Sequence, residues 1–191
     1  MCPPIEESDD DWAPGPDESL PLDLVPLLVV VIDSSTIIRI KTVVRTDDQW
    51  ELFTQMRALV EQGRLAFPSH VRREVSREKH ADAPGAWCGG AAKVVQHADP
   101  TENTLVEVLP TIARVVEADA EPNREPADPY VAAMAYELRA RGYDVAVATD
   151  DCVDRLPIKI ALTTACELLD LATWNCETFI EWVRSTMPEG A

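Results

Sequence analysis

The sequence predicts an α/β fold in three layers (α/β/α), with a central, mostly parallel sheet between two layers of helices. Residues 29–32 form a continuous β-branched apolar run, which is typical of a central parallel strand covered on both faces. A similar run occupies Asp144 to Thr149. Other segments carry apolar side chains at helical spacing. Strand-like runs that alternate with helical segments favour a parallel sheet.

The first part of the chain predicts a helix, a short strand and a second helix after the opening strand. The helix runs from Asp47 to Gln62, with an aspartate at 47 or 48 as its cap and Gly63 at its end. The short strand follows at Arg64 to Phe67. Ser69 can then cap a helix that runs to about Lys79.

The middle of the chain is less regular. Ala81 to Asp99 contains a proline and three glycines, which predict a loop with one broken helix. Asn103 to Glu117 predicts a helix that bends or restarts at Pro110. A turn-rich link follows at Glu121 to Pro126.

The next helix has clear limits. Asp128 is placed to cap it, Pro129 takes the first helical position, and Gly142 stands just after its end at Arg141. The strand at Asp144 to Thr149 comes next.

The chain closes with a helix, a strand and a helix. Pro157 to Leu171 is predicted to be mostly helical, and Ala172 to Trp174 to be a short strand. Asn175 then caps a last helix with apolar residues on one face.

The charge of the protein is unevenly distributed. Residues 1–27 hold eight acidic residues, six prolines and no Lys or Arg, within a chain of net charge −17. Such a composition cannot bury enough surface to offset the entropy of ordering, so we expect a disordered acidic tail. Its role is that of a solvating leader, or of a segment that binds a partner or masks the protein itself. The domain then spans residues 28–186.

Several classes of protein are excluded by composition. No apolar run approaches the roughly 20 residues that cross a bilayer, and the first residues lack the basic region of a signal peptide. We therefore expect a cytoplasmic protein without membrane partners. Five cysteines without a CxxC spacing argue against a disulfide framework or zinc ribbon. A zinc site from His80, Cys88 and His97 would lack a fourth ligand.

Acidic residues follow the predicted strands at the places where active sites form in parallel sheets. Asp33 follows the first strand, and Asp150 and Asp151 follow the strand that ends at Thr149. Asp128 stands at a helix start, and Glu74 lies in the helix after the second strand. Singly, these residues also fit a strand end, a helix cap and a solvated charge. Gathered carboxylates would repel unless a cation such as Mg²⁺ or Mn²⁺ neutralised them.

The order of these segments resembles that of the PIN-domain family. The resemblance covers residues 28–186. The motifs that carry it are Ile32-Asp33-Ser34-Ser35, Arg73-Glu74-Val75, Ala127-Asp128-Pro129 and Thr149-Asp150-Asp151.

The resemblance implies a Rossmann-like sheet and an endoribonuclease that uses Mg²⁺ or Mn²⁺. By motif, Asp33 and Asp128 would be metal ligands. The family pattern of Thr, any residue, then Asp selects Asp151 as a further ligand, with Asp150 as the alternative. Glu74 would bind metal or position the attacking water.

Supporting residues are implied in the same way. Ser35 and Thr149 would orient the carboxylates by hydrogen bonds. Basic residues beside Glu74 could hold RNA phosphates, or could be ordinary solvated charges. They are Arg72, Arg73, Arg77 and Lys79.

The resemblance also suggests partners. Many small PIN proteins are toxins of toxin–antitoxin pairs. The resemblance therefore suggests a cognate antitoxin as a second partner, in addition to the RNA substrate. PIN proteins are often dimers, which makes a homodimer an expectation as well. The main alternative is a catalytically silent PIN-like module that binds RNA or protein. A phosphatase of the haloacid-dehalogenase type would need a second aspartate where Ser35 stands. A nucleotide-binding Rossmann domain would have a GxGxxG motif after the first strand, and this sequence has none there.

Overall fold

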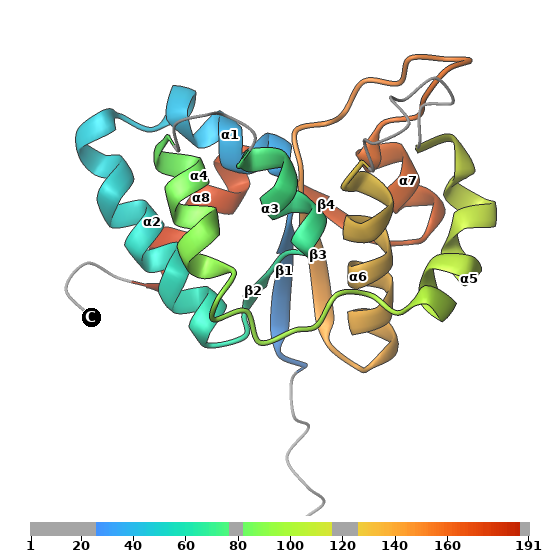
Figure 1. Cartoon of the computed structure of the whole chain (residues 1–191), viewed down its shortest axis with the longest axis horizontal. Helices are drawn as coiled ribbons and strands as arrows, with labels where there is room; N and C mark the ends of the chain where they lie inside the picture. The colour runs from blue at the N-terminus through green and yellow to red at the C-terminus, as the bar shows by residue number, and fades with distance from the viewer. Residues whose placement is uncertain (1–25, 77–81, 116–125, 188–191) are drawn as a thin grey trace, which may run out of the picture.

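The computed structural model has a parallel sheet at its centre, as the sequence predicts (Figure 1). It describes residues 26–76, 82–115 and 126–187. Residues 1–25 of the expected tail lie outside these ranges. The strands of the sheet are β1 (Leu28–Ile32), β2 (Leu65–Ala66), β3 (Asp144–Ala148) and β4 (Ala172–Trp174), in the order β2-β1-β3-β4. Each neighbouring pair is parallel.

Helices cover both faces of this sheet, so the expected three-layer α/β/α fold is confirmed. The helices are α1 (Ser34–Val43), α2 (Thr46–Glu61), α3 (Ser69–Val75), α4 (Ala83–Ala91), α5 (Glu102–Ile112), α6 (Asp128–Ala140), α7 (Leu162–Leu168) and α8 (Cys176–Thr186). In Figure 1, α1, α2, α4 and α8 lie on one side of the sheet and α5, α6 and α7 on the other. None of the helices within the described ranges is long and apolar enough to cross a membrane.

The core of the domain lies on both sides of β1. Val29, Val30, Val31 and Ile32 are all fully buried, because helices pack against alternate side chains of the strand from either face. Strand β3 is buried in the same way from Val145 to Ala148. The apolar runs that predicted a covered parallel sheet therefore form its two central strands.

Some expected element boundaries are wrong. Helix α2 begins at Thr46 with Arg45 before it, so neither aspartate of its first turn is the cap. Ser69 is the first residue of α3 and makes no capping bond, and this helix ends at Val75 rather than near Lys79. Its first N–H instead donates to the Asp99 carboxylate (2.7 Å).

The segment from Pro157 to Leu171 is also less helical than expected. Helix α7 begins only at Leu162, because Arg155 pairs with Lys159 in an isolated antiparallel bridge before it. In Figure 1 this segment rises from the end of β3 and passes above α7 before that helix begins.

Candidate active site

Asp33 is buried where β1 ends, with 1% of its surface exposed. Its backbone N–H continues the sheet ladder to the Ala148 carbonyl (2.9 Å), and its extended backbone makes it the N-cap of α1. Its Oδ2 accepts hydrogen bonds from the Ser35 N–H (3.2 Å), the Ser35 hydroxyl (2.6 Å) and the Thr149 hydroxyl (3.2 Å). One carboxylate oxygen is therefore fixed by three donors.

The charge of Asp33 is only partly compensated by these donors. Burial raises the pKa of Asp33 above its ordinary value, hydrogen bonds from Ser35 and Ser34 lower it, and the charge of Glu74 raises it again. Burial outweighs the hydrogen bonds, so the net shift is upward. A cation beside this carboxylate would relieve that cost.

Glu74 reaches the same place from α3. Its Oε2 accepts a hydrogen bond from the Ser34 hydroxyl (2.6 Å), and its Oε1 accepts from the Ala127 N–H (3.1 Å). The Ser34 hydroxyl also lies 3.4 Å from Asp33 Oδ1. Ser34 thus connects the first two acids, and Glu74 ties α3 to the start of α6.

Asp128 and Asp151 share one lysine. The Lys159 Nζ lies 2.7 Å from Asp128 Oδ2 and 3.2 Å from Asp151 Oδ2. The Leu162 N–H also donates to Asp151 Oδ2 (3.1 Å). Asp128 was expected to cap α6, but the helix has no side-chain cap, and the carboxylate contacts Lys159 instead.

The pKa values of Asp128 and Lys159 differ from those of an ion pair on the surface, because both groups are largely buried. Burial and the charge of Asp33 raise the pKa of Asp128 to about 6, although Lys159 lowers it. For Lys159, burial lowers the pKa, but the charges and hydrogen bonds of Asp128 and Asp151 raise it overall. The lysine is therefore a cation, and it only partly offsets the crowding of negative charge.

Asp150 belongs to a different set of contacts. It accepts hydrogen bonds from the Thr36 hydroxyl (3.2 Å) and the Cys176 N–H (3.4 Å), and it lies 3.5 Å from Arg39 Nε. These partners lie on α1 and α8. The side chains of Asp150 and Asp151 therefore point to different groups, and only Asp151 shares Lys159 with Asp128.

The structure thus brings four of the expected acids into one connected group. We call Asp33, Glu74, Asp128 and Asp151 the acidic cluster. As the side chains stand, the described residues include no set of three or more His, Cys, Asp or Glu arranged to hold a metal ion. Several carboxylate oxygens are instead turned toward Lys159 and hydroxyl groups.

A comparison with protein families places this site within a family. A model of the family described as "Domain of unknown function (DUF4411)" matches residues 30–186. The chain belongs to the DUF4411 family. The matched region contains the whole acidic cluster and Lys159. Among curated proteins no match was found. The description of the DUF4411 family states no activity, so the resemblance to PIN nucleases stays a prediction.

Two residues of the DUF4411 site are absent from the sequence prediction. The motif gives a role to Ser35 and none to Ser34, yet both hydroxyls contact carboxylates. The sequence prediction also gives no role to Lys159. Its one signal in the sequence is a charge between Ile158 and Ile160, close after two adjacent aspartates. Ser35 and Thr149 both contact Asp33, as the resemblance implied for residues that orient it.

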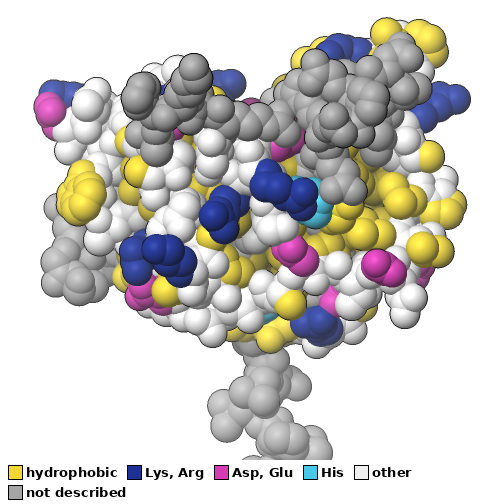
Figure 2. Space-filling model, in the orientation of Figure 1, with side chains coloured by type: hydrophobic (Ala, Val, Ile, Leu, Met, Phe, Trp, Pro, Cys, Tyr) yellow, Lys and Arg dark blue, Asp and Glu magenta, His cyan; other side chains and the backbone are white. Residues whose placement is uncertain are grey.

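The basic residues expected to bind RNA are only partly described. Arg72 and Arg73 are exposed on α3, and Lys and Arg side chains are visible over α3 and α4 in Figure 2. Arg77 and Lys79 lie outside the described residues.

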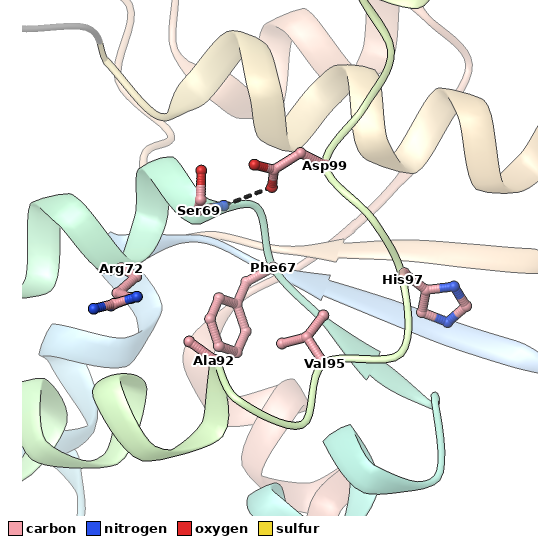
Figure 3. Close-up of a pocket in the computed structure, with 7 residues that line it drawn as sticks. All are labelled: Phe67, Ser69, Arg72, Ala92, Val95, His97 and Asp99. Carbon is pink, nitrogen blue, oxygen red and sulfur yellow. Dashed lines mark hydrogen bonds between the residues drawn. The ribbon is translucent and has the colours of Figure 1, made fainter.

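Arg72 also lines a small pocket beside α3, with a volume of about 200 Å³. Phe67 and Val95 lie at its centre, with Arg72 and His97 on opposite sides (Figure 3). No member of the acidic cluster lines it. Ser69 and Arg72 share a face of α3, whereas Glu74 lies on the opposite face by helical spacing.

Proposed function

We propose that this protein is a metal-dependent endoribonuclease of the PIN type, which hydrolyses phosphodiester bonds in RNA. The observation that carries the proposal is the acidic cluster. Its four carboxylates come from four separate segments of the chain and meet at the carboxyl ends of parallel strands, where α/β proteins bind their substrates.

The donor chemistry of the cluster fits a hard divalent cation. Carboxylate oxygens are the ligands that Mg²⁺ and Mn²⁺ prefer. Burial is the largest cause of the raised pKa values of Asp33 and Asp128, and the charge of a neighbouring acid adds to it, so a bound cation would favour both ionised forms. The ammonium of Lys159 already lies where two of the carboxylates converge. Asp33, Asp128 and Asp151 would hold the ion. When bound, it would polarise the phosphate and activate a water molecule.

The other residues of the site hold these groups in place. Ser35 and Thr149 fix one oxygen of Asp33, so the carboxylate cannot rotate freely. Ser34 and the Ala127 N–H fix Glu74 at both oxygens. Glu74 is placed either as a further ligand or as the group that orients the attacking water.

The substrate and partners follow from the same resemblance. Arg72 and Arg73 lie exposed on the helix that carries Glu74, where they could contact RNA phosphates. If the protein is the toxin of a toxin–antitoxin pair, it has a cognate antitoxin as a partner. A homodimer is the second proposed assembly, because PIN proteins are often dimers.

A second candidate is a catalytically silent PIN-like module that binds RNA or protein. The contacts of Lys159 favour it, because an ammonium already neutralises part of the cluster. A silent module would cleave no RNA even with metal bound. RNA cleavage therefore distinguishes the two candidates.

The test is cleavage of RNA by the purified full-length protein with Mg²⁺ or Mn²⁺, and with excess EDTA. We expect cleavage with metal and none with the chelator. Asp33→Asn should lower the rate by at least about a hundredfold, as the loss of a catalytic group does. Asp144→Asn is the matched control, because Asp144 is exposed at the opposite end of β3. Undiminished cleavage in EDTA, or by Asp33→Asn, would contradict the proposal.

A further inference from the structure

Lys159 is an unusual lysine because it is both enclosed and paired twice. Only 14% of its side chain is exposed, and its Nζ contacts carboxylates from two different elements. Lysine is rarely buried unless its charge is paired, because removing an ammonium from water is costly. Such a placement needs specific support from the surrounding chain.

The backbone supplies that support. The Arg155 N–H donates to the Lys159 carbonyl (2.8 Å), and the Lys159 N–H donates to the Arg155 carbonyl (3.1 Å). The next residue, Ile160, donates to the Arg114 carbonyl (2.9 Å). The Ala161 N–H then donates to Asp154 (2.7 Å). A hydrogen-bonded turn therefore fixes the backbone of Lys159.

The two carboxylates that face Lys159 are held just as firmly. Asp128 is the first residue of α6, and Asp151 accepts a hydrogen bond from the first N–H of α7. Lys159 Nζ thus lies at the point where these two elements meet. A metal ion shared by Asp128 Oδ2 and Asp151 Oδ2 would need the same space. Enzymes that use two metal ions on phosphodiesters hold them about 4 Å apart between shared carboxylates.

We propose that Lys159 is the resident cation of the Asp128–Asp151 side of the cluster, so that the site takes one divalent metal ion rather than two. This inference rests on the proposed function. Lys159 is a positioning residue: its ammonium holds the two carboxylates together and excludes a second ion. The one ion would then bind at Asp33 and at the oxygens of Asp128 and Asp151 that do not contact Lys159.

The test is a calorimetric titration of metal-free, full-length protein with Mn²⁺. We expect one ion per chain in the wild type and two in Lys159→Met, or a single ion bound at least tenfold more tightly. Lys159→Arg should bind like the wild type, because it keeps a cation in place. Lys93→Met is the matched control, since it removes one positive charge from an exposed lysine. It should also bind like the wild type.

Folding is checked by circular dichroism with and without Mn²⁺. If Lys159→Met does not fold, Lys159→Gln, which keeps a hydrogen-bond donor, takes its place. Equal stoichiometry and affinity in the wild type and the uncharged variant would overturn this role, as would two ions in the wild type. If cleavage stayed metal-dependent, the nuclease proposal would survive that result. Extra metal binding in the variant, together with no RNA cleavage by the wild type, would instead contradict the nuclease proposal and leave the role of Lys159 standing.

Discussion

Asp128 carries its charge in an unfavourable place. It is 8% exposed, and both burial and the neighbouring Asp33 disfavour its ionised form. Lys159 favours that form, but not enough to restore an ordinary pKa. A group that is held this way in a fold commonly has a functional reason, since active sites are where such shifts gather. The same shift makes the stability of the protein depend on pH.

We expect the contribution of Asp128 to the stability of the metal-free protein to fall as the pH rises from 4 to 6. The pKa of Asp128 is about 6 in the folded protein and has an ordinary value of 3.8. The folded state therefore binds a proton more tightly than the unfolded state, and this contribution is lost as the pH rises through the folded pKa. The difference corresponds to at most about 3 kcal/mol. Asp33 shifts in the same direction.

Melting temperature as a function of pH, measured in EDTA, checks this expectation. The change in melting temperature from pH 7.5 to pH 5 should be more positive in the wild type than in Asp128→Asn, by several degrees. Asp144→Asn, which removes an exposed carboxylate, should keep the wild-type slope. The same slope in Asp128→Asn and the wild type would show that another group is responsible.

At the scale of elements, the two adjacent acids after β3 have different roles. Asp150 holds helices together, whereas Asp151 belongs to the acidic cluster. Asp150 connects α1 and α8 through Thr36, Arg39 and the Cys176 N–H. Asp151 contacts Lys159 and the start of α7. Because β3 ends at Ala148, these partners, rather than strand alternation, distinguish the two acids.

We therefore expect Asp150→Asn and Asp151→Asn to differ in kind. Asp151→Asn should lower the cleavage rate by at least about a hundredfold. Asp150→Asn should lower it less, and should lower the melting temperature by about 2–4 °C through weaker contacts between α1 and α8. RNA cleavage, Mn²⁺ titration and thermal melts measure both effects. The reverse ranking in cleavage would make Asp150 the ligand.

Much of this architecture could be predicted from the sequence, because its central strands are buried on both faces. The run before Asp33 and the run before Asp150 have no polar alternation, and this pattern specifies a covered parallel sheet. Position at a strand end then predicts that the acids lie close together. Local signals also sufficed for the last helix, where Asn175 is the cap as expected.

Other features depend on tertiary packing that no local pattern reveals. The stretch Ser34–Val43 is rich in β-branched residues, which disfavour a helix, and it carried no prediction. It forms α1 because Asp33 caps it and because Ile37 and Ile40 are buried in the core. Lys159 could not be chosen from spacing either. Its role depends on the turn between Arg155 and Lys159, part of which the sequence predicts to be helical.

At the scale of the whole molecule, negative charge is concentrated rather than spread. The first 27 residues contribute −8 to the net charge of −17. Within the domain, four carboxylates meet at one edge of the sheet with a single lysine between two of them. A fold that gathers acids in this way is most stable with a further cation bound there. We propose that this cation is a divalent metal ion.

The most direct test of that claim is diffraction from crystals of the full-length protein grown with Mn²⁺, using the anomalous signal of manganese. The account predicts an anomalous peak within about 2–2.5 Å of carboxylate oxygens of both Asp33 and Asp128. The peak should be lost in crystals of Asp33→Asn and kept in crystals of Asp144→Asn. A map from the wild type with no peak at the acidic cluster, or with manganese bound only elsewhere, would contradict the account.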